Sequence, residues 1–254
     1  MERIRVQERN LKDIYNQYLL SKNEHHTAVR YKDKSWYHSS AAGLCARKHF
    51  FSSVSQVEGT PVGENTQRIF RLGNLVHEDI QDALTWYSQI HGLPLLIEKE
   101  IYLEDLNVRG YIDLALIDME GDDHVLYDIK TCNSFKWKNL FGRTPDPEPA
   151  ENYALQLGTY AYWYEQKYNL KLEKLALVYY NKDNSLIREV NVPKSFIDKA
   201  YRYWQDVNER FKIGIPEVSL GTAPVYEWEC NVKYCGYFNH CGGGLKGQSK
   251  WSKR

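Results

Sequence analysis

Two apolar segments, residues 109–117 and 124–131, flank an acidic turn, and each contains isolated charges within a strand-like pattern. Segments of this length, rich in Ile, Leu, Val and Tyr, are typical of β-strands. The turn DMEGDD joins them into a predicted antiparallel hairpin. Asp128 and Lys130 are two residues apart, so a strand points both side chains to one face. Burying two charges is costly unless they pair or bind a partner, and this hairpin therefore constrains both fold and chemistry.

The turn centres near Glu120–Gly121, which places Asp113 opposite Asp128 in the predicted hairpin. A one-residue slip would put these two acids on opposite faces, so the prediction depends on the register. Close carboxylates repel each other unless a cation lies between them, and Mg²⁺ or Mn²⁺ prefers such oxygen ligands. The hairpin therefore predicts a divalent-metal site. The alternative for Asp128 and Lys130 alone is a salt bridge on a solvated sheet face.

Helices and further strands surround the hairpin, and helix 64–91, which Gly92 ends, has the clearest apolar stripe. The stripe comprises Ile69, Leu72, Val76, Ile80, Ala83, Leu84 and Tyr87. The other expected elements are helices 9–20, 151–168 and 194–213, a short helix around Cys45, and strands 95–103, 174–181 and 185–192. This order predicts an α/β (α+β) fold, in which helices flank a mixed central sheet.

Charge must act locally in this chain, because 33 lysines and arginines balance 33 aspartates and glutamates. One local concentration is the segment 130–143, which has no acid. It contains Lys130, Lys136, Lys138 and Arg143 together with Phe135 and Trp137. Basic side chains follow phosphates and aromatic rings stack on bases, so the segment suits single-stranded DNA. An ordinary solvated loop is the alternative.

The chain shows no apolar run of about 18 residues and no apolar core of a secretory signal at its start. We therefore expect a cytoplasmic protein without a membrane partner. The odd count of five cysteines argues against a fully paired disulfide framework, so free thiols, metal ligands or catalytic groups are expected.

The motif G-x-x-D, from Gly110 to Asp113, and the motif D-x-K, from Asp128 to Lys130, resemble the PD-(D/E)XK nuclease superfamily. Its RecB-like branch also has an upstream helix with a histidine and a downstream Q-x-x-x-Y helix. This chain has His77 four residues after Gly73, and Gln156 followed by Tyr160. The motifs span residues 73–160 in the family's order. The resemblance implies a restriction-endonuclease-like fold.

The resemblance also implies roles for these residues in a nuclease that uses Mg²⁺ or Mn²⁺. The implied metal ligands are His77, Asp113, Asp128 and the Ile129 carbonyl. Asp113, Asp128 and Lys130 would be catalytic, with Lys130 orienting the attacking water or neutralising charge on the phosphate. Gln156, Tyr160, Lys136 and Lys138 would bind DNA or support the site. Glu98 and Glu100 lie on one face of the preceding strand, 95–103, and are expected to be surface acids, and the alternative is that they support the metal ligands from behind.

Three cysteines lie near the C-terminus as Cys230-x4-Cys235-x5-Cys241, and Cys45 is a fourth candidate ligand upstream. Four thiolates suit zinc or an iron–sulfur cluster, and structural zinc is the commoner of the two. One upstream and three C-terminal cysteines around a nuclease core resemble the iron–sulfur exonucleases of the RecB-like branch. These include CRISPR-associated spacer-acquisition exonucleases and viral relatives, so the resemblance implies a [4Fe–4S] cluster, with Zn²⁺ as the alternative. Cys132 fits no ligand set and is interpreted as a buried thiol.

These observations predict one nuclease domain over residues 1–254. It comprises an N-terminal helical arm (1–30), an iron–sulfur lobe (36–60 plus 215–241), a nuclease core (64–213) and a mobile basic tail (242–254). The expected activity is metal-dependent hydrolysis of single-stranded DNA by an exonuclease, 5′ to 3′ by resemblance, or by an end or flap processor. The alternatives are a non-catalytic DNA-binding adaptor and a structure-specific endonuclease. Single-stranded DNA ends are the expected partner, and partner nucleases, integrases or replication proteins are candidates in a prokaryotic or virus-infected cell.

Overall fold

The computed structural model describes residues 10–30, 36–55, 57–61, 63–117, 124–145, 151–215, 229–230, 232 and 235–241. A six-stranded mixed sheet lies at its centre, in the order β1-β3-β4-β5-β6, and β2 pairs with β3. The strands are β1 (Tyr37–His38), β2 (Leu95–Leu103), β3 (Val108–Ile117), β4 (His124–Cys132), β5 (Lys174–Asn181) and β6 (Ile187–Asn191). The β1–β3 and β4–β5 pairs are parallel, and the other pairs are antiparallel.

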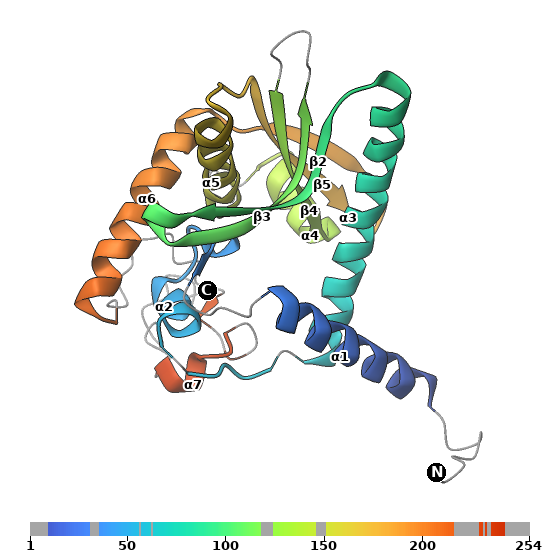
Figure 1. Cartoon of the computed structure of the whole chain (residues 1–254). Helices are drawn as coiled ribbons and strands as arrows, with labels where there is room; N and C mark the ends of the chain where they lie inside the picture. Colours follow the sequence, from blue (N-terminus) through green and yellow to red (C-terminus); the bar gives the residue numbers. More distant parts are fainter. Residues whose placement is uncertain are drawn as a thin grey trace.

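Helices flank both faces of this sheet (Figure 1). The helices are α1 (Leu11–Arg30), α2 (Ala46–Ser53), α3 (Glu64–His91), α4 (Ser134–Phe141), α5 (Glu151–Tyr168), α6 (Ser195–Ile213) and α7 (Phe238–Cys241). Helix α3 runs along one side, while α5 and then α6 cover the other, and α1 crosses the lower end of α3 (Figure 1). The predicted mixed sheet flanked by helices is therefore confirmed.

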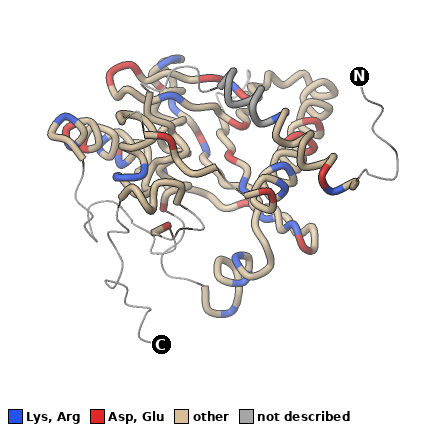
Figure 2. The backbone as a smooth tube through the Cα atoms, turned by 90° about the horizontal axis from the view of Figure 1, so that it is seen from below, with Lys and Arg blue, Asp and Glu red and all other residues tan. Residues whose placement is uncertain are grey.

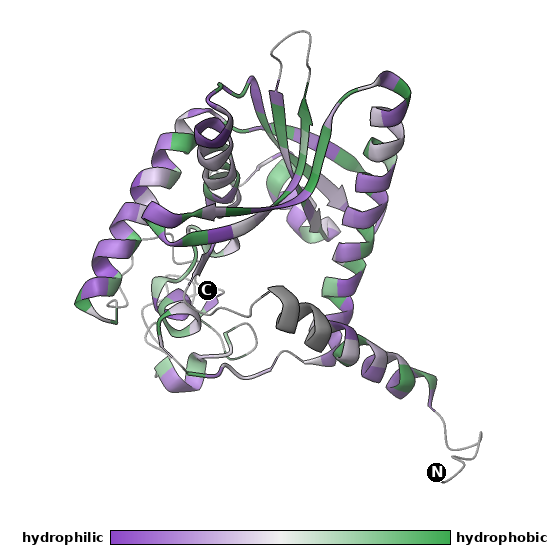
Figure 3. Cartoon of the chain, viewed as in Figure 1, coloured by the Kyte–Doolittle hydropathy of each residue, from purple (hydrophilic) through white to green (hydrophobic). Residues whose placement is uncertain are grey.

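The main hydrophobic core lies between the sheet and α5 and α6. Leu157 and Tyr164 of α5 and Trp204 of α6 are almost fully buried there. Gly158 lets the two helices approach closely, because a Cβ atom at this position would collide with the backbone of Phe196. Hydrophobic residues follow much of the upper sheet, whereas α6 shows a largely hydrophilic side (Figure 3).

Most predicted elements form close to the expected bounds. The helix over 64–91 is confirmed, and Gly92 ends it in the left-handed conformation at φ 67°. Two segments differ: the N-terminal helix continues to Arg30, and residues 134–141, for which no helix was predicted, form α4. Residues 242–254, the predicted tail, lie outside the described residues.

The predicted apolar stripe of α3 does not form its buried face. Gln67 and Gln81 are the buried residues of this helix, whereas Ile69 and Leu72 are about half exposed. The helix turns a polar side toward the strands because the sheet presents acidic groups at that point. The amphipathic pattern therefore predicted the helix correctly but predicted the wrong face of it to be buried.

Strands β2 and β3 both depart from regular geometry at the point where Glu98 faces Asp113. Ile112 and Ala115 both belong to the main core although they are three residues apart, so the alternation of β3 is interrupted between them. Opposite this point, Glu98 of β2 has a left-handed φ of 47°. The β3–β4 ladder ends at the pair Leu114–Tyr127, which leaves Asp113 where the two strands part.

Basic and acidic residues are interspersed along the described chain (Figure 2), as expected for equal numbers of both charges. Among the helices that the structure describes, none combines the length and the apolar character needed to cross a membrane.

Candidate active site and metal centre

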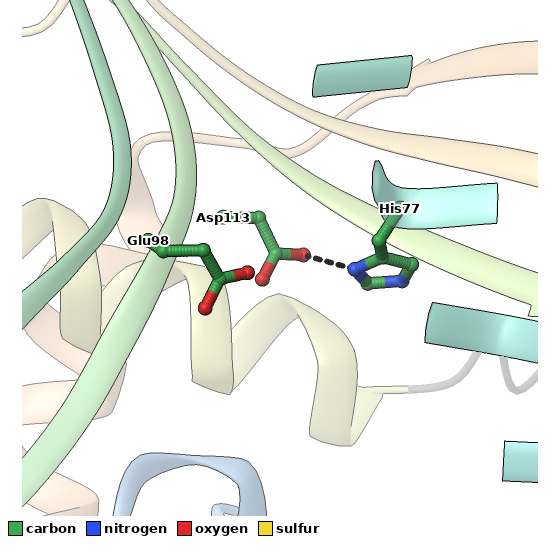
Figure 4. Close-up of side chains that lie close together, drawn as sticks. All are labelled: His77, Glu98 and Asp113. Atoms are coloured by element: carbon green, nitrogen blue, oxygen red, sulfur yellow. Dashed lines mark ion pairs between the residues drawn. The ribbon is translucent and has the colours of Figure 1, made fainter. Parts of the chain in front are cut away.

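Three candidate metal ligands meet at the irregular point of the sheet. His77 of α3, Glu98 of β2 and Asp113 of β3 each offer one ligand atom, and these atoms lie within 4.8 Å of one another. The two carboxylates lie side by side, and the imidazole faces that of Asp113 (Figure 4). The Nδ1 atom of His77 is 3.6 Å from Oδ2 of Asp113. His77 and Asp113 were predicted as ligands, whereas Glu98 was expected at the surface.

Gln81 holds the two strands of this site in place from α3. Its Nε2 donates to Oε1 of Glu98 and to the Asp113 carbonyl, both at 3.1 Å. The burial of a glutamine on this helix is therefore explained, because its amide satisfies two acceptors at once. The left-handed conformation of Glu98 is strained for a residue with a side chain, and such strain is typical of functional sites.

Asp113 also bridges the gap to β4. Its Oδ2 accepts a hydrogen bond of 2.8 Å from the Ile129 amide, in place of a backbone ladder bond. The backbone of Ile129 also hydrogen-bonds to His77, so the predicted carbonyl ligand lies beside the candidate metal centre. Continuing the β3–β4 register places Asp113 opposite Asp128, in agreement with the predicted hairpin.

Asp128 and Lys130 form a buried ion pair next to this centre. Lys130 Nζ is 2.5 Å from Oδ2 of Asp128, and the Asp128 side chain is fully buried. Burial raises the pKa of Asp128 to about 7; Lys130 acts in the opposite direction, and Asp113 raises it further. Among the described residues, Oδ1 of Asp128 has no hydrogen-bond donor. Such a buried carboxylate oxygen is costly unless a cation approaches it.

The pKa of His77 is lowered and that of Lys130 is raised. Burial, followed by the nearby Lys130 cation, lowers the pKa of His77, so its imidazole is available as a neutral ligand. Burial opposes the charge of Lys130, but Asp128 and Asp113 outweigh it and raise its pKa. Lys130 is therefore a cation at neutral pH.

Lys130 is held by a chain of hydrogen bonds from α5. Its Nζ donates to Gln156 Oε1 at 3.0 Å, and Gln156 Nε2 donates to the Tyr160 hydroxyl at 2.8 Å. Ser39 donates to the same hydroxyl at 3.1 Å. Tyr160 is only 2% exposed, so the Q-x-x-x-Y motif is placed to support Lys130, and Tyr160 is out of reach of a DNA strand.

The two lysines of α4 differ in their surroundings. Lys136 Nζ donates to the Tyr153 hydroxyl at 2.8 Å, and the Tyr153 ring also lies 4.8 Å from Nζ of Lys130. Lys138 is exposed on the same helix. Tyr153 thus connects the α4 lysine to the buried lysine, a contact that the sequence alone did not suggest.

The four cysteines come together between the start and the end of the described chain. Burial raises the pKa of the Cys235 thiol, and Cys230 and Cys241 raise it further. Cys45 is close enough to Cys235 for the two thiols to affect each other electrostatically. Within the described part of the chain, no three of these sulfurs lie within 4.8 Å of one another. Cys132 is buried, as predicted.

Comparisons with known proteins find a matching family model and solved structures of similar fold. A family model described as the PD-(D/E)XK nuclease superfamily matches residues 82–242. The crystal structure of SSO0001 aligns with a TM-score of 0.59 at 19% identity, over 91% of this chain and 98% of that chain. An alkaline exonuclease from Laribacter hongkongensis aligns with a TM-score of 0.46 at 13% identity, over 73% of this chain and 92% of that chain. A search of curated protein sequences finds no match.

Proposed function

Because the chain belongs to the PD-(D/E)XK nuclease superfamily, we propose that it is a metal-dependent DNA nuclease that hydrolyses phosphodiester bonds. The observation that carries the proposal is the convergence of His77, Glu98 and Asp113 beside the buried pair of Asp128 and Lys130. Paired carboxylates that share a site with a lysine are expensive to maintain for stability alone. They suit a site that binds a cation and a phosphate.

The donor groups fit a hard divalent cation such as Mg²⁺ or Mn²⁺. Glu98 and Asp113 offer carboxylate oxygens, and His77 offers a neutral ring nitrogen. Asp128 adds a buried oxygen that has no hydrogen-bond donor among the described residues. A bound cation would polarise the phosphate and lower the pKa of a coordinated water.

Lys130 supplies positive charge next to these carboxylates. Its ammonium group can donate a hydrogen bond to a phosphate oxygen and stabilise the negative charge that develops there. Gln156 fixes the direction of this group, and Tyr160 fixes Gln156 in turn. The buried chain from Ser39 to Lys130 therefore acts on the reaction by positioning one cation.

Single-stranded DNA ends are the substrate that we propose, cut by an exonuclease or an end or flap processor. The basic and aromatic α4, which follows β4 directly, supports a single strand. The 5′ to 3′ direction, the cytoplasmic location and a partner nuclease, integrase or replication protein rest on sequence-based inference. A non-catalytic adaptor and a structure-specific endonuclease are the rival functions.

End-labelled single-stranded DNA tests the proposal directly. With Mn²⁺ the wild-type protein should shorten the strand, and EDTA should stop the reaction. Asp113→Asn should reduce the rate at least about 100-fold, whereas Asp82→Asn, at an exposed position of α3, should leave it unchanged. Equal activity of the two variants would refute the assignment. Absence of cleavage would favour the adaptor, and cleavage of circular single strands would favour the endonuclease.

For Cys45, Cys230, Cys235 and Cys241 we propose a structural metal centre that joins residues 36–60 to 215–241. Four thiolates suit either a tetrahedral zinc ion or an iron–sulfur cluster. The resemblance of the cysteine pattern to the iron–sulfur exonucleases is what favours the cluster over zinc. Anaerobically purified protein should therefore be coloured, whereas a colourless protein with one equivalent of zinc would support the alternative.

A further inference from the structure

Helix α4 presents an aromatic ring to solvent close to the proposed active site. Phe135 is 74% exposed, more than any other aromatic side chain that the structure describes. Trp137 and Phe141 of the same helix pack against the main core, so α4 is anchored without the Phe135 ring. A single exposed phenylalanine is common in proteins, and its meaning depends on its surroundings.

The N-terminus of α4 is fixed by two hydrogen bonds. Asn133 Oδ1 accepts from the Lys136 amide at 2.9 Å, and Asp183 Oδ2 accepts from the Ser134 amide at 2.8 Å. The bonds from Ser134 also lower the pKa of the Asp183 carboxyl, which is therefore an anion at neutral pH. The exposed ring thus stands on a rigid helical turn, and a rigid aromatic surface loses little entropy when it binds a partner.

The helix is linked to the active site through Tyr153. Lys136 Nζ lies 4.4 Å from the Tyr153 ring centroid, and Lys130 Nζ lies 4.8 Å from the same centroid. Phe135 is five residues after Lys130, so the two Cα atoms are at most about 17 Å apart. A ring at this position is within a few nucleotides of a phosphate held at Lys130.

We infer that Phe135 stacks on a base of single-stranded DNA within a few nucleotides of the scissile phosphate and thereby contributes to the preference for single strands. This inference rests on the proposed nuclease function. A base in the interior of a duplex has both faces covered by its neighbours, so away from a duplex end this ring can stack only on an unstacked base. Lys138, exposed on the same helix, contacts the backbone phosphate.

Binding measurements without metal separate stacking from attraction to phosphate. The probes are a fluorescent thymidine oligonucleotide and an abasic oligonucleotide of the same length, titrated in EDTA so that neither is cut. Phe135→Ala should weaken thymidine-strand binding about 5- to 100-fold and abasic-strand binding less than about twofold. Phe135→Trp should retain wild-type affinity, and Lys138→Ala should weaken both probes. Trp86→Ala removes an exposed ring of α3 (64% exposed) and should change neither.

Equal weakening of both probes by Phe135→Ala, or no weakening of either, would overturn the stacking site. So would a wild-type protein that does not bind the thymidine strand. The nuclease proposal is tested separately by cleavage in Mn²⁺ with Asp113→Asn. A protein that cuts DNA with unchanged binding in Phe135→Ala would therefore refute only the stacking inference.

Discussion

In the proposed metal site a proton and the metal ion compete for Asp128, and the raised pKa of this residue makes the competition measurable. With a pKa of about 7, the carboxyl is about 10% ionised at pH 6 and about 90% ionised at pH 8. Only the ionised form is a ligand, so the apparent metal affinity should rise with pH. The expected change in the Kd for Mn²⁺ is about tenfold between pH 8 and pH 6.

The sign of this effect follows from a carboxyl whose pKa is raised, mainly by burial. As the pH falls through about 7, the carboxyl takes up a proton and the site loses one negative ligand. His77 does not reverse the trend, because burial lowers the pKa of its imidazole, and any protonation of this ligand at low pH would also weaken metal binding. At saturating Mn²⁺ the metal displaces the proton, and the pH dependence of metal occupancy should disappear.

Electron paramagnetic resonance of free Mn²⁺ provides the assay, with titrations at pH 6, 7 and 8. Asp128→Asn should bind Mn²⁺ more weakly at pH 8 and show a nearly flat pH profile. Asp82→Asn, at an exposed position of α3, should keep the tenfold change. A wild-type Kd that varies by less than twofold would refute the reasoning, as would a tenfold change that persists in Asp128→Asn.

Three further predictions concern stability. Burial lowers the pKa of His49 to about 3, so on acidification this imidazole takes up a proton in the unfolded chain before it does in the folded protein, and stability falls as the pH drops below about 6.5. Urea unfolding should show that this residue lowers the free energy of unfolding by about 2 kcal/mol between pH 8 and pH 5. The loss should be absent in His49→Phe. A methyl group at Gly110 would lie 2.8 Å from Cβ of Ser39, so Gly110→Ala should lower the free energy of unfolding by about 1–3 kcal/mol, unlike Gly63→Ala at an open position. At pH 9, where Asp128 of the wild-type protein is ionised, Lys130→Met should cost up to about 3–5 kcal/mol because it strands a buried carboxylate. Adding Asp128→Asn should recover much of that loss, and strictly additive effects in thermal denaturation would contradict the buried pair.

The β3–β4 hairpin was predictable because two independent signals agree on its register. The apolar residues of both segments and the acidic turn between them give the same centre, and the observed pairs, such as Leu114 with Tyr127, follow it. The sequence alone could not show that the ladder ends at that pair. The parting of the strands depends on packing against α3 and α5, which are remote in sequence.

Helix α4 was missed although its signals are present. Asn133 is an N-cap residue, and Trp137, Leu140 and Phe141 have helical spacing. A helix of eight residues rich in basic and aromatic side chains is marginal by itself. It forms here because Trp137 and Phe141 pack on the core and Asp183, from the β5–β6 turn, binds its first turn. Such tertiary support is not visible in local sequence.

Glu98 shows where sequence reasoning reaches its limit at the active site. The chain from 95 to 117 is a second hairpin, whose centre near Leu106 places Glu98 opposite Asp113 by the arithmetic that paired Asp113 with Asp128. Glu98 was therefore predictable as a neighbour of Asp113. Its place among the candidate ligands was not predictable, because it depends on a departure from regular strand geometry at Glu98. A glutamate in the left-handed conformation costs about 1–2 kcal/mol relative to ordinary backbone, and no sequence pattern predicts this conformation. The strain coincides with the interrupted alternation of β3 and with the hydrogen bond from Gln81. Together these features turn two carboxylates from neighbouring strands toward one histidine, so the backbone distortion is part of what builds the candidate metal site.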